Sequence, residues 1–137
     1  MTADDQIRKH NLIPHPEGGH YRETFRQKPP GGGRGSLTTI LYLLRAGERS
    51  HWHRVTDAVE VWHFHEGDPL MLLVSPDGRR VERHLLGPGG AHQVVVPANV
   101  WQSAEPQGDW SLVGCAVAPA FELGSFELAP VGWAPSV

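Results

Sequence analysis

A short segment carries the residue types that most often do chemistry: the histidines His51 and His53, followed by the carboxylate of Glu60. Side chains two residues apart on an extended strand project from the same face, so His51 and His53 are predicted to point together. Two imidazoles and a carboxylate suit Fe, Ni, Mn or Zn and leave coordination positions open for a substrate. The segment therefore predicts a divalent-metal site, and the plain alternative is a histidine-rich strand without chemistry.

The next strand is predicted to carry Glu60, Trp62 and Phe64 on one face. Aromatic side chains beside a carboxylate can form the wall of a ligand pocket or simply fill a core. His63 and His65 share the opposite face of this strand. We expect these two histidines either to serve the site or to lie at a contact between subunits.

The elements that must position these residues are predicted to be mainly strands. Glycine and proline make up 28 of the 137 residues, which disfavours an all-helical bundle. A short helix is predicted over residues 2–12, with Thr2 as its N-cap. Strands are predicted at residues 21–26, 37–44, 59–65, 69–74, 80–86, 92–96 and 110–117, with an edge strand at 121–128. Short strands with glycine-rich turns indicate an all-β sandwich or barrel, and a small jelly roll could hold a ligand inside.

The composition indicates a single domain over residues 1–137 and argues against two classes of partner. The formal net charge is −3 and no basic stripe is present, so no nucleic acid is expected to bind. No apolar run approaches the ~20 residues of a membrane-spanning helix. The N-terminal residues lack the basic and apolar regions of a signal peptide, and Cys115 is the single cysteine. We therefore expect a cytoplasmic location.

Two motifs resemble those of the cupin superfamily. The first is a His-x-His pair, a glutamate and a glycine, here His51, His53, Glu60 and Gly67 with a longer turn over 55–59. The second contains a proline, a glycine and a histidine, whose positions are taken here by Pro97, Asn99 and Gln102. Asn99 can adopt the left-handed turn of the glycine it replaces. Gln102 is a weaker metal ligand than the histidine it replaces.

A set of short blocks is similar to cupin family five, a group of unknown function, over about residues 8–130. The blocks are residues 15–24, 50–54, 60–64, 67–70, 95–97, 117–121 and 126–128, together with Trp101. The resemblance implies a double-stranded β-helix, or jelly-roll, barrel with a short N-terminal helix. It also implies a homodimer and a lumenal pocket similar to that of nucleotide-sugar epimerases.

Two catalytic functions are open at this point. In a metal-dependent enzyme, the ligands would be His51, His53, Glu60 and Gln102, and the metal would act as a Lewis acid or activate water or oxygen. In a metal-free epimerase or isomerase, His53 would be the base and Tyr21 or Glu60 its partner. Histidine titrates near neutrality, and a carboxylate in a dry pocket can orient it for proton transfer next to a carbonyl.

The third function is a binding module without catalysis. Its planar ligand would stack on Trp62, Phe64 and Trp101 and form hydrogen bonds with Glu17, Gln102 and His53. In all three cases the expected partner is a small molecule in the barrel lumen.

Overall fold

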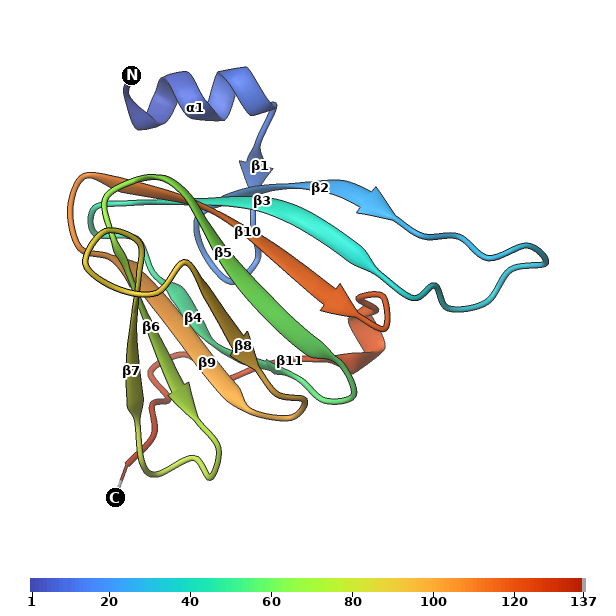
Figure 1. Ribbon diagram of the computed structural model, residues 1–137. Coiled ribbons are helices and arrows are strands. Elements are labelled where there is room, and N and C mark those ends of the chain that lie inside the picture. The colour runs from blue at the N-terminus through green and yellow to red at the C-terminus, as the bar shows by residue number, and fades with distance from the viewer. Residues whose placement is uncertain (137) are drawn as a thin grey trace.

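The chain folds into two antiparallel β-sheets with a helix packed outside them (Figure 1), and the computed structural model describes residues 1–136. The helices are α1 (Ala3–His10) and the short 3-10 helix η1 (Leu123–Ser125). The strands are β1 (Ile13–Pro14), β2 (His20–Arg26), β3 (Thr38–Arg45), β4 (Ser50–Val55), β5 (Val59–Gly67), β6 (Leu70–Ser75), β7 (Glu82–Leu86), β8 (Gln93–Val96), β9 (Trp101–Pro106), β10 (Trp110–Ala118) and β11 (Phe126–Leu128). The predicted all-β jelly roll with a short N-terminal helix is confirmed.

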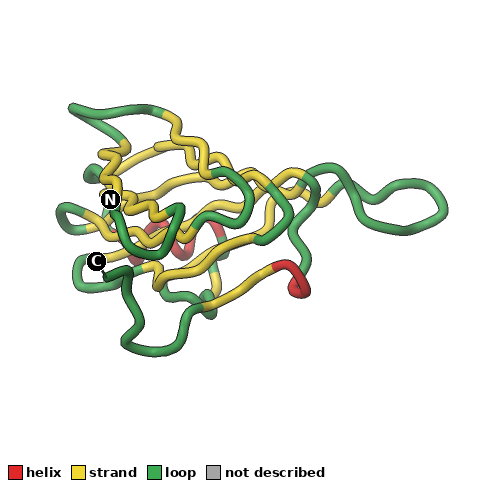
Figure 2. The backbone as a smooth tube through the Cα atoms, turned by 90° about the horizontal axis from the view of Figure 1, so that it is seen from below, coloured by secondary structure: helices red, strands yellow, loops and turns green. Residues whose placement is uncertain are grey.

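Strands far apart in the sequence pair side by side in both sheets. The order is β1-β2-β3-β10-β5-β8 in the larger sheet and β11-β4-β9-β6-β7 in the smaller one. Figure 2, seen from below, shows the strands running through the body of the molecule with loops gathered at both ends. Because side chains alternate along each strand, one face of every long strand points between the two sheets.

Apolar residues on these inner faces form the main core. Tyr42, Trp62, Leu72 and Val96 are all at least 95% buried in it. Burying one such large side chain stabilises the fold by roughly 1.5–3 kcal/mol. Cys115 belongs to this core and also lines the cavity described below, so the core and the candidate site are adjacent.

Helix α1 covers part of the outer face of the larger sheet. Thr2 caps the helix, because its side chain accepts a hydrogen bond from the Asp5 backbone N–H while the Asp5 carboxylate accepts one from the Thr2 N–H. Ile7 packs with Leu12 and Leu43 against the sheet. The helix ends at Asn11, which has a left-handed conformation with φ of 55°. In the described part of the chain, neither helix is long and apolar enough to cross a membrane.

Strand β9 is absent from the strands that the sequence predicts. Its residues include Ser103, Glu105 and Pro106, which are uncommon in strands. The strand forms because it lies between β4 and β6 and pairs with both. Its inward positions are buried, and one of them is Gln102. A strand with weak propensity therefore carries a residue of the candidate site.

Candidate functional site

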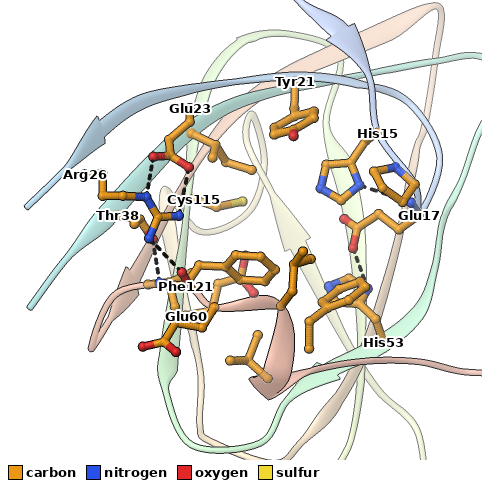
Figure 3. Close-up of a pocket in the computed structure, with 17 residues that line it drawn as sticks. His15, Glu17, Tyr21, Glu23, Arg26, Thr38, His53, Glu60, Cys115 and Phe121 are labelled. Carbon is orange, nitrogen blue, oxygen red and sulfur yellow. Dashed lines mark hydrogen bonds and ion pairs between the residues drawn. The ribbon is translucent and has the colours of Figure 1, made fainter. Parts of the chain in front are cut away.

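A cavity of about 470 Å³ lies between the inner faces of the two sheets (Figure 3). It is lined by the turn before β2, by inward residues of six strands and by the segment around η1: His15, Pro16, Glu17, Tyr21, Glu23, Arg26, Thr38, Ile40, His53, Val55, Glu60, Cys115, Val117, Phe121, Glu122, Leu123 and Phe126. Figure 3 shows His15, Glu17 and His53 on one side of the cavity and Glu23, Arg26 and Thr38 on the other. Leu123, which is 79% exposed, marks the rim.

A tight turn with two glycines places Glu17 in the cavity wall. Gly18 has φ of 112°, and a Cβ atom there would lie 2.1 Å from the Arg49 carbonyl oxygen. Gly19 has φ of 79°, and a Cβ atom there would lie 2.7 Å from the carbonyl oxygen of Leu43. Only glycine accepts both the backbone conformation and the close approach. The turn therefore packs directly on the sheet, with the Glu17 side chain 94% buried.

His53 is held in one tautomer by its neighbours. Its Nδ1 atom lies 2.8 Å from the carbonyl oxygen of His51 and 3.1 Å from Oε2 of Glu17. A carbonyl oxygen can only accept a hydrogen bond, so Nδ1 carries the hydrogen and Nε2 keeps its lone pair. The other oxygen of Glu17 accepts a hydrogen bond of 2.9 Å from the Ser50 hydroxyl. The Glu17–His53 pair is thus an oriented base, and both residues line the cavity.

A second buried chain of hydrogen bonds orients Glu60. The Trp62 indole N–H donates to Oε1 of Gln102 at 2.7 Å, and Nε2 of Gln102 donates to Oε1 of Glu60 at 2.8 Å. Because an indole N–H can only donate, Trp62 decides which way the Gln102 amide faces. The amide therefore presents its NH2 group, not its oxygen, to the carboxylate.

Burial shifts the pKa values of the groups around the cavity. It raises the pKa of Glu17 and of Glu60, because a charged carboxylate loses solvation there. It lowers the pKa of His53, and the nearby Glu60 carboxylate opposes that shift. The pKa of His15 is lowered for the same reason, with Glu17 opposing. At neutral pH the cavity therefore holds neutral imidazoles beside carboxyl groups that retain protons more readily than usual.

The structure does not bring His51 and His53 to one face. Ser50 pairs with Ala104 and His53 with Gln102, so three steps along β4 match two along β9. This β-bulge breaks the alternation that the sequence prediction assumes. His51 turns outward, and its Nε2 atom lies 3.1 Å from the carbonyl oxygen of Pro130.

The predicted metal ligands His51, His53, Glu60 and Gln102 do not fit a metal ion as arranged. His51 points away, and the Gln102 amide directs its oxygen to the Trp62 N–H and its NH2 group, which cannot bind a metal, to Glu60. Among residues 1–136, no group of three or more His, Cys, Asp or Glu side chains is placed to hold a metal ion. We therefore derive no chemistry through a metal at this site.

The other predicted site residues fall in three places. Tyr21 lines the cavity as expected, with its ring centroid 4.4 Å from that of His15. Trp62 and Phe64 are not among the lining residues and pack in or against the core. Trp101 packs elsewhere, 4.7 Å from the Trp133 ring between centroids and beneath the guanidinium of Arg54. The predicted aromatic wall is therefore not the wall of this cavity.

His63 and His65 lie on the outer face of the larger sheet. They border a separate shallow groove together with Thr24, Thr39 and Gly114. They do not line the cavity between the sheets.

Several lining residues were not predicted from the sequence. Phe121 and Phe126 come from the C-terminal segment, which is held at the cavity by the pairing of β11 with β4 and by the hydrogen bond from the Phe121 N–H to the Thr38 hydroxyl. Glu23 shares a strand face with Tyr21, so period-two spacing was a usable signal for it. Arg26 reaches the same face because the β2–β3 register shifts between Glu23 and Phe25.

Comparisons with known proteins agree with this fold. The sequence model of the family described as Cupin superfamily (DUF985) matches residues 4–129. A solved protein of Shewanella oneidensis is similar, with 38% identity over 94% of this chain and 85% of that chain and a TM-score of 0.86. A hypothetical protein from Leishmania major shows 31% identity over 97% of this chain and 90% of that chain, with a TM-score of 0.85. No curated protein matches.

The fold also occurs in structures that are more distant in sequence. A dTDP sugar isomerase from Desulfovibrio desulfuricans has 15% identity over 92% of both chains and a TM-score of 0.62. At this identity the likeness concerns the arrangement of strands only.

Proposed function

The chain belongs to the DUF985 family of the cupin superfamily, and we propose that it is an enzyme that moves a proton on a small molecule held in the barrel. The observation that carries the proposal is the bonding of His53. Its Nδ1–H is held by the His51 carbonyl and Glu17, which leaves the lone pair of Nε2 as the base. This pattern of a carboxylate and an oriented, buried imidazole in the wall of a cavity suits general base catalysis.

Glu60 is the proposed acid. Its Oε1 atom accepts a hydrogen bond from Gln102, and burial raises its pKa, so the other carboxyl oxygen can hold a proton. In the proposed step, the C–H bond beside a carbonyl breaks and its proton goes to Nε2 of His53. The electron pair moves onto the carbonyl oxygen, which takes the proton of Glu60. Reprotonation at carbon by a second route would complete an isomerisation or epimerisation.

Tyr21 supplies the alternative partner. Its ring lines the cavity, and Figure 3 shows it apart from His53 rather than beside it. A tyrosine in that position could protonate a substrate carbon on the face that His53 does not reach. The sugar isomerase that shares the fold agrees with this reaction class, but the proposal rests on the residues because the identity is only 15%.

Proton exchange with solvent tests the proposal directly. The protein is incubated in D2O with a panel of small α-hydroxy aldehydes and ketones. We expect it to exchange the hydrogen beside the carbonyl of some of them for deuterium, which is measured as the loss of that signal in proton NMR. His53→Gln should lower the exchange rate by about 100-fold or more, since it removes the base. Glu17→Gln should lower it by about 10-fold, since it removes only the orienting group.

Two controls complete this experiment. His51→Gln should leave the rate unchanged, because its side chain lies outside the cavity and its carbonyl is retained. Treatment with a chelator should also leave the rate unchanged, because no step uses a metal. Exchange that survives in His53→Gln, or that is lost on chelation, would refute the mechanism. If the wild-type protein bound a ligand without catalysing exchange, the result would favour a binding module over an enzyme.

A further inference from the structure

The charges around the cavity have one dominant sign, and this bears on which molecules can enter. Four of the lining residues are glutamates, namely Glu17, Glu23, Glu60 and Glu122, whereas Arg26 supplies the single permanent positive charge of the lining. We infer that the cavity selects an amine-bearing small molecule over a neutral one and disfavours anions such as phosphates and carboxylates. The inference rests on the proposed use of this cavity for a small molecule, and it names the substrate class.

Arg26 is already paired with a carboxylate, which weakens its attraction for an anion. Its Nε atom donates to Oε1 of Glu23 at 2.8 Å, and one terminal nitrogen donates to Oε2 of Glu23 at 3.0 Å. The other terminal nitrogen donates to the carbonyl oxygen of Phe121 at 2.9 Å. All three nitrogen atoms are therefore used within the protein. These bonds use three of the five guanidinium N–H groups, and the Glu23 carboxylate balances the charge, so a phosphate or carboxylate would have to compete with Glu23 for Arg26.

The second arginine near the rim is engaged in the same way. Arg34 forms two hydrogen bonds with the Asp57 carboxylate, at 2.9 and 3.0 Å, and its Nε donates to the Ala120 carbonyl at 2.9 Å. Its Nε also lies 3.1 Å from Oε1 of Glu122. These bonds hold the segment before η1 in place. Arg34, like Arg26, is therefore paired with a carboxylate.

The interior of the cavity offers further groups that favour a cation. Glu17 and Glu60 are both buried, and no lysine or arginine faces them among the lining residues that the structure describes. The rings of Tyr21, Phe121 and Phe126 line the same space. Aromatic faces attract cations, most strongly where water is excluded. An ammonium group placed among these rings and beside the Glu17 carboxylate would be stabilised, whereas an anion would meet Arg26 already paired with Glu23.

The charge pattern distinguishes this cavity from one built for nucleotide-linked sugars. A pyrophosphate carries at least two negative charges and is recognised by free arginines, lysines or backbone N–H groups at a helix N-terminus. Here the arginines are bound to glutamate, aspartate and carbonyl oxygens. A compact amino ketone or amino sugar fits both the charge and the volume of about 470 Å³.

A charge-balanced ligand screen tests this inference. The library contains equal numbers of anionic, neutral and cationic molecules of monosaccharide size, including glucosamine, glucose and glucose 6-phosphate as a matched set. Binding is read from amide chemical-shift changes at Tyr21, Phe121 and Phe126. We expect the cavity binders to be cationic first and neutral second, with matched anions at least about 10-fold weaker. The preference should shrink as salt is added, because rim charges are screened.

A paired set of variants assigns the effect to the rim. Glu23→Gln removes the carboxylate that neutralises Arg26. The ratio of the affinity for the amine to the affinity for its matched anion should therefore fall by about 10-fold or disappear. Glu127→Gln is the matched control, because Glu127 forms an equivalent pair with Arg54 that lies outside the cavity lining. That control should keep the wild-type order of affinities.

The outcomes separate this inference from the proposed function. Three results would overturn the inference. They are an anion that binds in the cavity as tightly as its matched amine, an order of affinities that is unchanged in Glu23→Gln, and the absence of any ligand that binds in the cavity. Deuterium exchange on an anionic substrate would overturn the inference and keep the acid–base mechanism. Selective amine binding without any exchange would keep the inference and remove the mechanism.

Discussion

Glu17 and His53 show how burial and hydrogen bonding define a residue's chemistry before any ligand arrives. The backbone carbonyl of His51 accepts the Nδ1 hydrogen, and Glu17 supports the same orientation. Burial then keeps the imidazole neutral, because it lowers the pKa of His53. A neutral imidazole with a fixed tautomer is the form that can accept a proton.

This burial predicts that acid weakens the fold through His53. The folded pKa lies below the ordinary 6.5, so the unfolded chain binds a proton at this residue more readily. The contribution of neutral His53 is therefore complete above 6.5 and is lost as the pH falls through that value towards the folded pKa. We expect the urea midpoint to drop between about pH 7 and about pH 5, and to drop less in His53→Gln.

His84→Gln provides the control for this titration. His84 is part-exposed on β7, away from the cavity lining, so its replacement should keep the wild-type drop in the urea midpoint. A drop in His53→Gln as large as in the wild type would show that other groups cause the acid sensitivity.

At the scale of elements, local departures from regular strand geometry build the site. The bulge in β4 separates His51 from His53, and the Gly18–Gly19 turn brings Glu17 against β3 and β4. Strand β9 forms between two partners despite its weak propensity and supplies Gln102. None of these features follows from a period of two along the sequence.

Gly18→Ala is expected to destabilise the protein through this turn. The new Cβ atom would lie 2.1 Å from the Arg49 carbonyl oxygen, and the residue would keep φ of 112°. We expect a loss of about 2 kcal/mol or more in the free energy of unfolding, because both the contact and the dihedral are unfavourable. Gly124→Ala, where a Cβ atom meets open space, should change stability by less than about 0.5 kcal/mol. Thermal unfolding of the two variants measures both, and equal stabilities would contradict the role of the turn.

At the scale of the molecule, the larger sheet has an outer face that α1 covers only in part. Val95 on β8 is 60% exposed and Val59 on β5 is 39% exposed. His63 and His65 lie on the same outer face. Uncovered apolar side chains on a sheet face and on an edge strand favour association. This face is therefore where we place the contact of the homodimer expected from the sequence.

Light scattering tests the homodimer. We expect twice the chain mass of 15.1 kDa at micromolar concentration. Val95→Glu should shift the mass towards that of one chain, because it would bury a charge at the contact. The exposed Leu123→Glu, at the cavity rim, should keep the dimer. A monomeric wild type would contradict this prediction.

Much of the architecture was predictable from local patterns. Alternating strands with glycine-rich turns indicate an all-β sandwich or barrel, the family resemblance specifies a jelly roll, and the observed β2, β3, β5 and β10 lie within about two residues of their predicted ranges. Asn99 adopts the left-handed conformation that its residue type allows, with φ of 65°. These features depend on residues near one another in the chain, so the sequence alone carries the information.

The amino-acid sequence by itself determined the fold class, the helix with its Thr2 cap, and the histidine, glutamates and tyrosine from which the cavity is built. Only the tertiary structure decided which of them meet. The β4 bulge turns His51 outward, Trp62 turns the Gln102 amide, and β11 brings Phe126 over the cavity. Each of these outcomes depends on pairing between segments many residues apart. Such pairing depends on the packing of the whole barrel, so the alternation of side chains along a single strand cannot predict it.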